Sequence, residues 1–325
     1  MHALKLVHDK MTPELSGERI HDSVFWRGAA PRLSVCVPVY RYDVTALMDA
    51  LAACKSSTLT EMIFYDDGGC DQDLLAKLES HAGRVPAAIR IVSAAANRGR
   101  SAARNAAIRH ARCDWLLLLD ADMMPDDPRF LEAYLDAIDT TWEPAVIVGG
   151  YSLKSAQSDK AHALHRWQAE ASECLPAAAR SKAPGRNVFS SNVLVHKLVL
   201  DACPFDERFA GWGWEDTDWG LRAQRFFPIR HIDNTATHLG LDTDAALMAK
   251  YAKSGENFVL MTTRHRDEAA RMPLYRMARR FRRLPMRKHM TALAERMARA
   301  QFLPLALRGR ALKAWRALVY AGALP

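Results

Sequence analysis

Between residues 32 and 122, short apolar runs alternate with segments of helical periodicity, and this alternation restricts the fold more than any other feature. The apolar runs are nearly continuous, and helical patterns separate them. The predicted strands are 32–40, 61–67, 89–94 and 114–122, and the predicted helices are 44–57, 73–83 and 100–112. Continuous apolar strands joined by helices are typical of βαβ units in a parallel sheet that is covered on both faces. The pattern predicts an α/β fold.

The second half of the chain has a more mixed pattern. It predicts strands and helices without a strict alternation, at 145–153 (strand), 159–172 (helix), 188–196 (strand), 218–227 (helix) and 228–240 (strand). We therefore expect a Rossmann-like mixed sheet, mostly parallel, with helices on its faces.

Composition excludes several protein classes. The chain has 325 residues, of which 49% are hydrophobic and 25% charged, which is typical of a folded globular protein. No uncharged apolar run reaches the roughly 18 residues of a membrane span, and the N-terminus lacks the apolar region of a secretion signal, so we expect a cytoplasmic protein. The six cysteines show no C-x-x-C pair, which favours buried thiols over disulfides or a zinc site.

The positive charge is concentrated at the C-terminal end. Residues 264–325 hold 16 Lys/Arg and only 3 Asp/Glu. At helical spacing this tail has one apolar stripe, made of Leu303, Leu307, Leu312, Trp315 and Val319. A basic amphipathic helix predicts peripheral contact with the anionic inner face of the cell membrane. The alternatives are a helical cap on the catalytic domain, a homodimer surface and a nucleic-acid patch, and we expect no nucleic-acid partner because no recognised motif accompanies the charge.

Polar residues follow the ends of two predicted strands, where ligands bind in parallel sheets. Asp120 and Asp122 end the run "WLLLLDAD", and strand alternation would place both carboxylates on one side, separated only by Ala121. A divalent cation is the usual reason for two carboxylates to lie this close. Asp66 and Asp67 precede a Gly-Gly turn, where a carboxylate can accept a hydrogen bond from a base or ribose.

Two further features suit an anionic ligand and a metal. The segment 97–105 opens a helix with a glycine and the arginines Arg98, Arg100 and Arg104, which favours phosphate oxygens over the alternative of a solvated basic face. His238 follows the last predicted strand. Beside a D-x-D pair, it becomes a candidate nitrogen ligand that favours manganese over magnesium, with a structural histidine as the alternative.

Seven segments, taken in order, carry a family resemblance: "VCVPVY", "YDDGG", "NRGRSAARNAAI", "LLLLDADMMPDDPRFL", "SSNVLVHKLVL", "FDERFAGWGWEDTDWGLRAQ" and "THLG". Over about residues 32–260 this set resembles glycosyltransferase family 2, inverting enzymes with the GT-A fold. The "GWGWEDTD" stretch is also similar to a motif of galactosyl- and N-acetylgalactosaminyltransferases. The resemblance implies an N-terminal extension at 1–30, a GT-A domain at 31–262 and a basic helical tail at 263–325.

The resemblance also implies roles for individual residues. Asp216 would be the catalytic base, with Glu215 beside it binding the acceptor, and Asp122 and His238 would hold Mn²⁺ or Mg²⁺. Trp212 and Trp214 offer flat faces on which an acceptor sugar can stack, whereas Asp218 is expected to be structural. The residues expected to bind the nucleotide sugar are Pro38, Val39, Tyr40, Asp66, Asp67, Asn97, Gly99, Arg104, Asp120 and Ala121.

The expected function is metal-dependent, inverting sugar transfer. The donor would be a UDP-sugar of galactose, glucose or their N-acetylated forms, and the acceptor a hydroxyl of a glycan or lipid-linked glycan in bacterial surface polysaccharide synthesis. A sugar-nucleotide pyrophosphorylase would need a Gly-rich loop after the first strand, and a dehydrogenase G-x-G-x-x-G, but "VPVYRYDV" contains neither. A catalytically silent nucleotide-sugar-binding or scaffold protein remains the non-enzymatic alternative.

Overall fold

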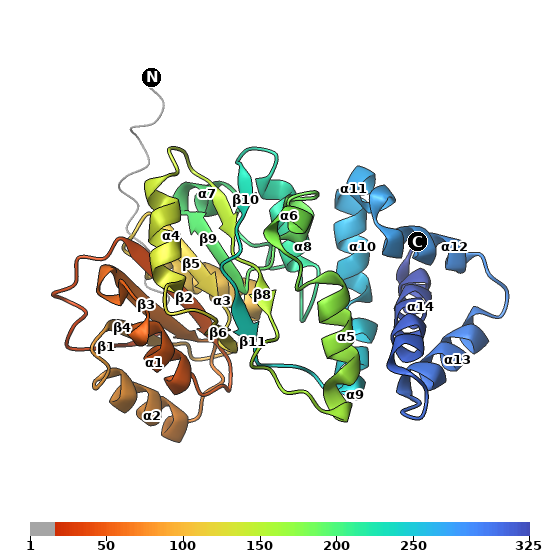
Figure 1. Ribbon diagram of the computed structural model, residues 1–325, viewed down its shortest axis with the longest axis horizontal. Coiled ribbons are helices and arrows are strands. Elements are labelled where there is room, and N and C mark those ends of the chain that lie inside the picture. Colours follow the sequence, from red (N-terminus) through yellow and green to blue (C-terminus); the bar gives the residue numbers. More distant parts are fainter. Residues whose placement is uncertain (1–16) are drawn as a thin grey trace.

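The first predicted strand, β2 (Leu33–Val39), lies near the centre of an eight-stranded sheet in a computed structural model that describes residues 17–325. The strand order is β1-β4-β3-β2-β5-β9-β7-β10. The four strands around β2 are mutually parallel, as predicted: β4 (Ala88–Ser93), β3 (Thr60–Asp66), β2 and β5 (Trp115–Leu119). The connecting helices are α1 (Thr45–Ala53), α2 (Gln72–Ala82) and α3 (Arg100–Arg109). Helices cover both faces, which explains why these strands are apolar over most of their length (Figure 1).

The remaining strands make the sheet mixed. β9 (Asn192–His196) lies antiparallel between β5 and β7 (Val146–Val148), and β10 (Ile229–His231) runs parallel to β7 at the edge. The other helices of this region are α4 (Phe130–Asp139), α6 (Ala177–Arg180), α7 (Lys197–Ala202) and α8 (Glu215–Ala223). The mixed, mostly parallel α/β fold expected from the sequence is confirmed.

The opposite edge of the sheet uses residues that the sequence assigned to an N-terminal extension. β1 (Arg19–Asp22) pairs antiparallel with β4. Trp26 is buried, with the guanidinium groups of Arg90 and Arg112 at 4.4 and 4.3 Å from its ring. The sheet domain therefore includes part of the segment 1–30, whose first 16 residues lie outside the described part.

Two predicted strands are each split between two sheets. Segment 145–153 forms β7 and β8 (Tyr151–Ser152), and segment 228–240 forms β10 and β11 (Ala236–His238). Gly150 separates β7 from β8 with φ of 77°, a left-handed conformation that ends the extended strand. β8 and β11 join β6 (Met123–Pro125) in a small sheet of order β6-β11-β8. This small sheet has a direct consequence for the site, because it places His238 opposite Met123.

The D-x-D pair lies in a turn rather than at the end of a strand. β5 stops at Leu119, and the N–H of Met123 donates to the carbonyl of Asp120 at 3.1 Å. The sequence analysis expected strand alternation to place Asp120 and Asp122 on one side. This expectation is wrong, because the two residues lie in a turn after β5. The turn carries the chain from the large sheet into the small one.

A layer of helices packs against the side of the sheet domain that carries α8 (Figure 1). It consists of α5 (Ala163–Ser172), α9 (Asp244–Lys253), α10 (Gly255–Arg264), α11 (Arg266–Arg271), α12 (Pro273–Arg282), α13 (Arg287–Arg299) and α14 (Leu305–Ala323). α14 contacts α5, α9, α10, α12 and α13. The expected boundary at 262/263 falls inside α10, so the tail is continuous with the helices before it.

The apolar stripe assigned to a membrane surface faces the protein interior over much of its length. Leu312 and Trp315 are only 1% and 5% exposed, in a cluster that includes Leu164 of α5 and Leu247 of α9. Arg308 of the same helix is also buried and pairs with Asp244. The assignment of this stripe to a membrane surface is therefore wrong for its buried part, which forms the core of a helical cap. Within residues 17–325, no helix has the length and apolar character needed to cross a bilayer.

Candidate active site

A pocket of about 390 Å³ lies beyond the carboxyl ends of β2, β3 and β5. It contains Asp122 and nine of the ten residues expected to bind the nucleotide sugar, all except Asp66. Tyr42, Arg100, Ala103 and Gly211 complete the lining. The rule that ligands bind at the carboxyl edge of a parallel sheet therefore locates this pocket correctly.

The two aspartates that follow β3 have different surroundings. Asp67 accepts hydrogen bonds from the backbone N–H groups of Arg98 and Gly99 at 3.0 and 2.8 Å, which ties the end of β3 to the start of α3. Burial raises the pKa of Asp67 despite these two bonds. Asp66 instead accepts from the N–H groups of Gly69 and Cys70 within its own turn. Asp66 thus shapes the turn and lies outside the pocket lining.

Asp122 and His238 lie side by side because β6 and β11 pair. The Nε2 atom of His238 is 3.2 Å from Oδ2 of Asp122, and the N–H of Leu239 donates to the Asp122 carbonyl at 2.9 Å. Gly240 packs so closely that a Cβ there would lie 2.0 Å from the same Oδ2. Burial opposes the charged form of His238, but the hydrogen bond and charge of Asp122 outweigh it and raise the pKa of the imidazole.

These two side chains fit a metal bound jointly with a nucleotide. Among the described residues, no group of three or more His, Cys, Asp or Glu gathers in a way that would hold an ion by itself. Asp122 lines the pocket and offers a carboxylate oxygen, and His238, which is not among the lining residues, offers an imidazole nitrogen 3.2 Å from that carboxylate. Cations in nucleotide sites commonly take one or two protein ligands and complete their shell with phosphate oxygens and water. The mixed O/N donor set suits manganese.

Arg104 connects the D-x-D turn to the helix that carries Asp216. Its guanidinium is 2% exposed, and its Nη2 donates to Oδ1 of Asp120 at 2.9 Å. Its Nη1 lies 3.8 Å from Oδ1 of Asp216. Within the described chain, Nε and Nη1 have no hydrogen-bond partner. Burial disfavours the cation, but the charges of Asp120 and Asp216 outweigh it and raise the pKa of Arg104.

Asp216 lies in the first turn of α8, next to the pocket but not in its lining. Ser190 holds its carboxylate from both sides: the hydroxyl donates to Oδ1 at 2.5 Å and the backbone N–H to Oδ2 at 3.2 Å. Glu215 is buried and 3.8 Å from Arg100, and burial together with the charge of Asp216 raises its pKa. The helix N-terminus favours carboxylates in this turn. The side chain of Asp216 remains about a quarter exposed, so it is accessible to a ligand.

Residues 34–191 match the family model described as "Glycosyl transferase family 2". This match, which spans just under half of the chain, identifies residues 34–191 as a family 2 glycosyltransferase domain. The family and the transferase class expected from the sequence are therefore confirmed.

Two solved structures resemble this chain in fold. The mannosyltransferase PcManGT from Pyrobaculum calidifontis, in complex with GDP-Man and Mn²⁺, aligns with a TM-score of 0.56 and 15% identity, over 91% of this chain and 76% of that one. TarS residues 1–349 from S. aureus align with a TM-score of 0.50 and 16% identity, over 88% and 90%. At this identity the likeness shows the GT-A fold alone.

A curated relative matches a smaller part of the chain. The uncharacterized protein y4gI of Sinorhizobium fredii is 31% identical over 129 residues, or 37% of this chain. The match spans only 14% of the length of that protein.

The tryptophans of the "GWGW" loop attach the candidate site to the helical layer. The ring centroid of Trp212 lies 5.6 Å from that of Tyr251, and that of Trp214 lies 5.0 Å from that of Phe258. The Nε1–H of Trp214 also donates to the hydroxyl of Tyr320 at 3.3 Å. Both tryptophans are half-buried, so part of their surface is already used for packing. Their role in acceptor binding stays a prediction.

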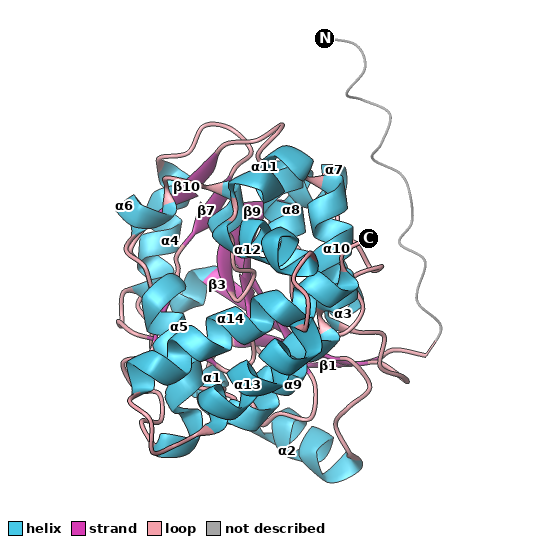
Figure 2. Cartoon of the chain, turned by 90° about the vertical axis from the view of Figure 1, so that its right-hand side faces the viewer, coloured by secondary structure: helices cyan, strands magenta, loops and turns pink. Residues whose placement is uncertain are grey.

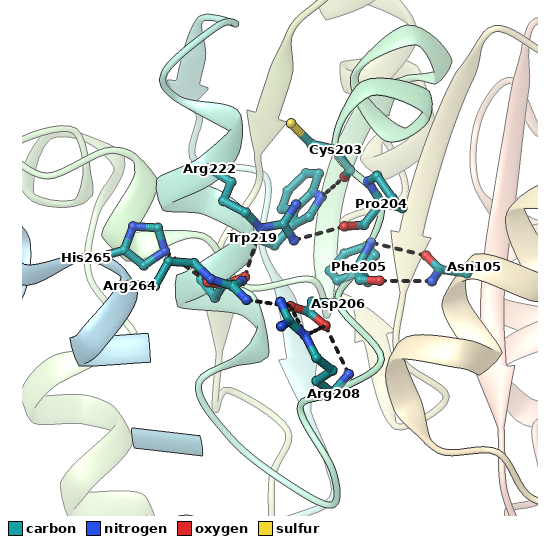
Figure 3. Close-up of polar contacts among 11 residues, drawn as sticks. Asn105, Cys203, Pro204, Phe205, Asp206, Arg208, Trp219, Arg222, Arg264 and His265 are labelled. Atoms are coloured by element: carbon teal, nitrogen blue, oxygen red, sulfur yellow. Dashed lines mark hydrogen bonds and ion pairs between the residues drawn. The ribbon is translucent and has the colours of Figure 1, made fainter. Parts of the chain in front are cut away.

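Asp218 has the structural surroundings expected from the sequence. It is fully buried and accepts from Arg222 Nε at 2.9 Å, Arg264 Nη1 at 2.7 Å and His265 Nε2 at 2.9 Å. Figure 3 shows these three side chains converging, with Arg264 extending to Asp206. This polar cluster joins α8, which carries Asp216, to the end of α10.

Sequence patterns did not single out Ser190. It lies 26 residues before Asp216 and belongs to no recognised local motif. Its contact exists because β9 returns antiparallel beside β5, with residue 190 near the same edge of the sheet as the D-x-D turn. A signal was present only in the "SSN" of the family resemblance, which does not indicate which serine faces the site.

Proposed function

We propose that this protein transfers a sugar from a nucleotide-sugar donor to an acceptor hydroxyl with inversion at the anomeric carbon. The observation that supports this most strongly is the position of Arg104, 2.9 Å from Asp120 and 3.8 Å from Asp216. One buried cation therefore connects the D-x-D turn, on the donor side of the pocket, with the candidate base. Donor and acceptor groups can meet over such a short span.

The donor we propose is a UDP-sugar of galactose, glucose or their N-acetylated forms. The end of β2 and the turn after β3 supply Val39, Tyr40 and Asp67 for the uridine, and the D-x-D turn supplies Asp120 for the ribose. The GDP-Man complex of PcManGT supports a nucleotide-sugar donor for this fold. The choice of uridine and of these sugars rests on the resemblance of the local motifs.

Asp122 and His238 would hold a divalent cation, for which we propose Mn²⁺ with Mg²⁺ as the alternative. Such a cation supplies positive charge that stabilises the departing diphosphate. The Mn²⁺ in the PcManGT complex supports a metal in this fold. Arg100 adds a protein cation at the same pocket.

The transfer step follows from the placement of Asp216. Its carboxylate accepts the proton of the acceptor hydroxyl while the hydroxyl oxygen bonds to the anomeric carbon and the bond from that carbon to the diphosphate oxygen breaks. Ser190 fixes the orientation of the carboxylate, and Arg104 balances its charge. A single displacement of this kind inverts the configuration. Glu215 is proposed to bind another hydroxyl of the acceptor, with Trp212 and Trp214 beside it.

The acceptor we propose is a glycan or lipid-linked glycan in the synthesis of a bacterial surface polysaccharide. This part of the proposal rests on the "GWGWEDTD" resemblance and on the basic helices near the C-terminus. Measuring the formation of a lipid-linked glycan product in native membranes would test this part of the proposal directly.

The decisive test measures UDP release from a panel of UDP-sugars with and without Mn²⁺, in the parent and in Asp216→Asn. Loss of a general base typically lowers the rate on the order of 10²–10⁴-fold. We expect a loss in this range, while Asp201→Asn, which removes an exposed carboxylate from α7, keeps the parental rate.

Three outcomes contradict parts of the proposal. Parental activity in Asp216→Asn would show that another group removes the proton. Turnover of GDP-mannose in place of UDP-sugars would overturn the choice of uridine. Binding of a sugar nucleotide without any turnover in the parent would favour the silent binding protein.

A further inference from the structure

Two helices that both pack on α14 carry exposed arginines and exposed large apolar side chains: α12 with its following turn, and α13. α12, α13 and α14 face the viewer in Figure 2, on the side of the molecule away from the large sheet. We call the exposed part of α12, α13 and the flanking turns the outer surface. Its residues are Arg276, Arg279, Arg280, Arg282, Arg283, Met286, Lys288, Met290, Leu293 and Phe302.

The charge of the outer surface is almost entirely positive. Residues 272–299 contain nine Lys/Arg and a single acidic residue, Glu295, which pairs with Arg299 at 2.9 Å. Five arginines of α12 and the following turn line an open groove of about 640 Å³ together with Tyr275. Within the described part of the chain, no carboxylate pairs with any of these five. Uncompensated like charges this close together favour an anionic partner.

The apolar part of the outer surface follows one face of α13. Met290 and Leu293, three positions apart in α13, have side chains on one face of the helix, and Met286 is the residue that immediately precedes the helix. Met286 and Leu293 are 69% and 60% exposed, and Phe302 in the turn after α13 is 89% exposed. Ala294 and Ala298, on a different face, are buried in the helical layer. α13 is thus attached through Ala294, Ala298 and the partly buried Met297, and it presents Met290 and Leu293 to solvent.

We propose that the outer surface docks on an anionic phospholipid membrane, with lipid phosphates in the arginine-lined groove and the apolar face of α13 in the interface. Methionine, leucine and phenylalanine beside arginine are the combination that binds at lipid interfaces. A second copy of this chain would bring the same positive charge against itself. A nucleic acid gains little from exposed Met and Leu, and Tyr275 is the sole aromatic residue lining the groove.

The outer surface differs from the α14 stripe that the sequence suggested for membrane contact, because the centre of that stripe is buried. It does not depend on the transfer reaction, because none of its residues lines the nucleotide pocket. Docking there would hold the glycosyltransferase at the membrane surface, where lipid-linked acceptors are found.

The test is cosedimentation of the full chain with vesicles of phosphatidylcholine, with or without phosphatidylglycerol, at low and high salt. We expect binding that requires phosphatidylglycerol and weakens with salt. Arg279→Glu/Arg280→Glu/Arg283→Glu lowers the partition coefficient on the order of 100-fold, from about fivefold for each arginine lost. Met286→Asp/Leu293→Asp/Phe302→Asp also releases the chain from anionic vesicles, because it removes the groups that enter the interface.

The matched control is Trp142→Asp/Arg230→Glu, which changes an exposed aromatic residue and a neighbouring arginine at the distant β10 edge of the sheet. This control binds vesicles like the parent. Circular dichroism melting and UDP release are measured on every variant, so a folding failure or an inactive enzyme is distinguished from lost docking.

Three results would overturn the proposal. The first is equal binding of the parent and both outer-surface variants to anionic vesicles, or no binding by the parent. The second is tighter binding of the parent to a short RNA duplex than to the vesicles, with the same arginine dependence. The third is conversion of a dimer to a monomer by the apolar triple variant, which would identify a homodimer interface.

Discussion

At the scale of single residues, Arg104 has the most consequential surroundings. Two carboxylates from separate elements, Asp120 and Asp216, face one buried guanidinium. Without that cation the carboxylates would repel each other, and burial would raise the cost of keeping both ionised. Arg104 therefore sets the charge of the D-x-D turn and of the candidate base together. Neither the helical pattern nor the D-x-D spacing predicts this connection.

Gly240 allows a prediction about the candidate metal site. Replacement by alanine places a Cβ about where Oδ2 of Asp122 now lies, 2.0 Å away, so Asp122 must move away from His238. Disturbing a group that positions a metal ligand typically lowers metal affinity 10- to 100-fold. We expect Gly240→Ala to shift the Mn²⁺ concentration for half-maximal UDP release upward by roughly that factor.

The control for this substitution is Gly28→Ala, because no atom lies within 4 Å of an added Cβ there. It leaves the Mn²⁺ dependence unchanged. If Gly240→Ala and the parent gave the same Mn²⁺ titration, Asp122 would not be a ligand of the metal.

At the scale of elements, the link between α8 and α10 is the cluster around Asp218. Burial opposes the ionised carboxyl, but hydrogen bonds from His265 and Arg222 outweigh it and lower the pKa of Asp218. The hydrogen bond from Arg208, together with Arg264, likewise holds the pKa of Asp206 well below its usual range. A single cluster thus fastens the helix bearing Asp216 to the helical layer.

These shifts predict how stability depends on pH. Both folded-state pKa values lie below the unfolded value of about 3.9, so the stabilisation is fully present above that value and is lost as pH falls through the folded-state values. We expect the urea midpoint to drop as pH falls below about 4, because the unfolded chain then binds more protons than the folded one. Asp218→Asn is less stable at neutral pH by about 3–5 kcal/mol, since it leaves buried cations unpaired, and its midpoint falls less steeply in acid.

Asp201→Asn controls for the loss of one negative charge at an exposed position. Parallel pH curves for the parent and Asp218→Asn would show that the cluster does not contribute to acid unfolding.

At the scale of the whole molecule, the sheet domain and the helical layer form one body. Tyr320 of α14 accepts the hydrogen bond from Trp214, and Arg316 of the same helix lies 4.0 Å from the ring of Tyr251. The final helix therefore supports the loop that leads into α8. Removing the tail would expose the aromatic groups that position this loop.

Two leucines of the same helix test whether the α14 stripe is core. Leu312 is 1% exposed and Leu307 is 37% exposed. Leu312→Ala creates a cavity and is expected to cost about 2–5 kcal/mol of unfolding free energy, measured by urea denaturation. Leu307→Ala on the same helix costs less than about 1 kcal/mol, because its side chain is partly in water already. Equally small losses of unfolding free energy for the two variants would show that the stripe is not part of the core.

The local elements, and the edge of the sheet at which the pocket lies, could be predicted from the amino-acid sequence alone. Continuous apolar strands and intervening helices predicted the parallel core, and the polar residues that end those strands predicted the pocket formed by Val39, Asp67 and Asp120. These features can be predicted from the sequence because burial on both faces, helix periodicity and turn chemistry depend on a few neighbouring residues.

Which distant groups meet depends on the tertiary structure. The pairing of β6 with β11 brings His238 to Asp122, and the antiparallel return of β9 brings Ser190 to Asp216. The tertiary structure also decided that the stripe through Leu312 covers the helical layer rather than a membrane. A hydrophobic pattern shows that a face must be buried, but the burial free energy is non-directional and does not specify the partner. The packing of the whole chain determines that this face is buried against the helical layer.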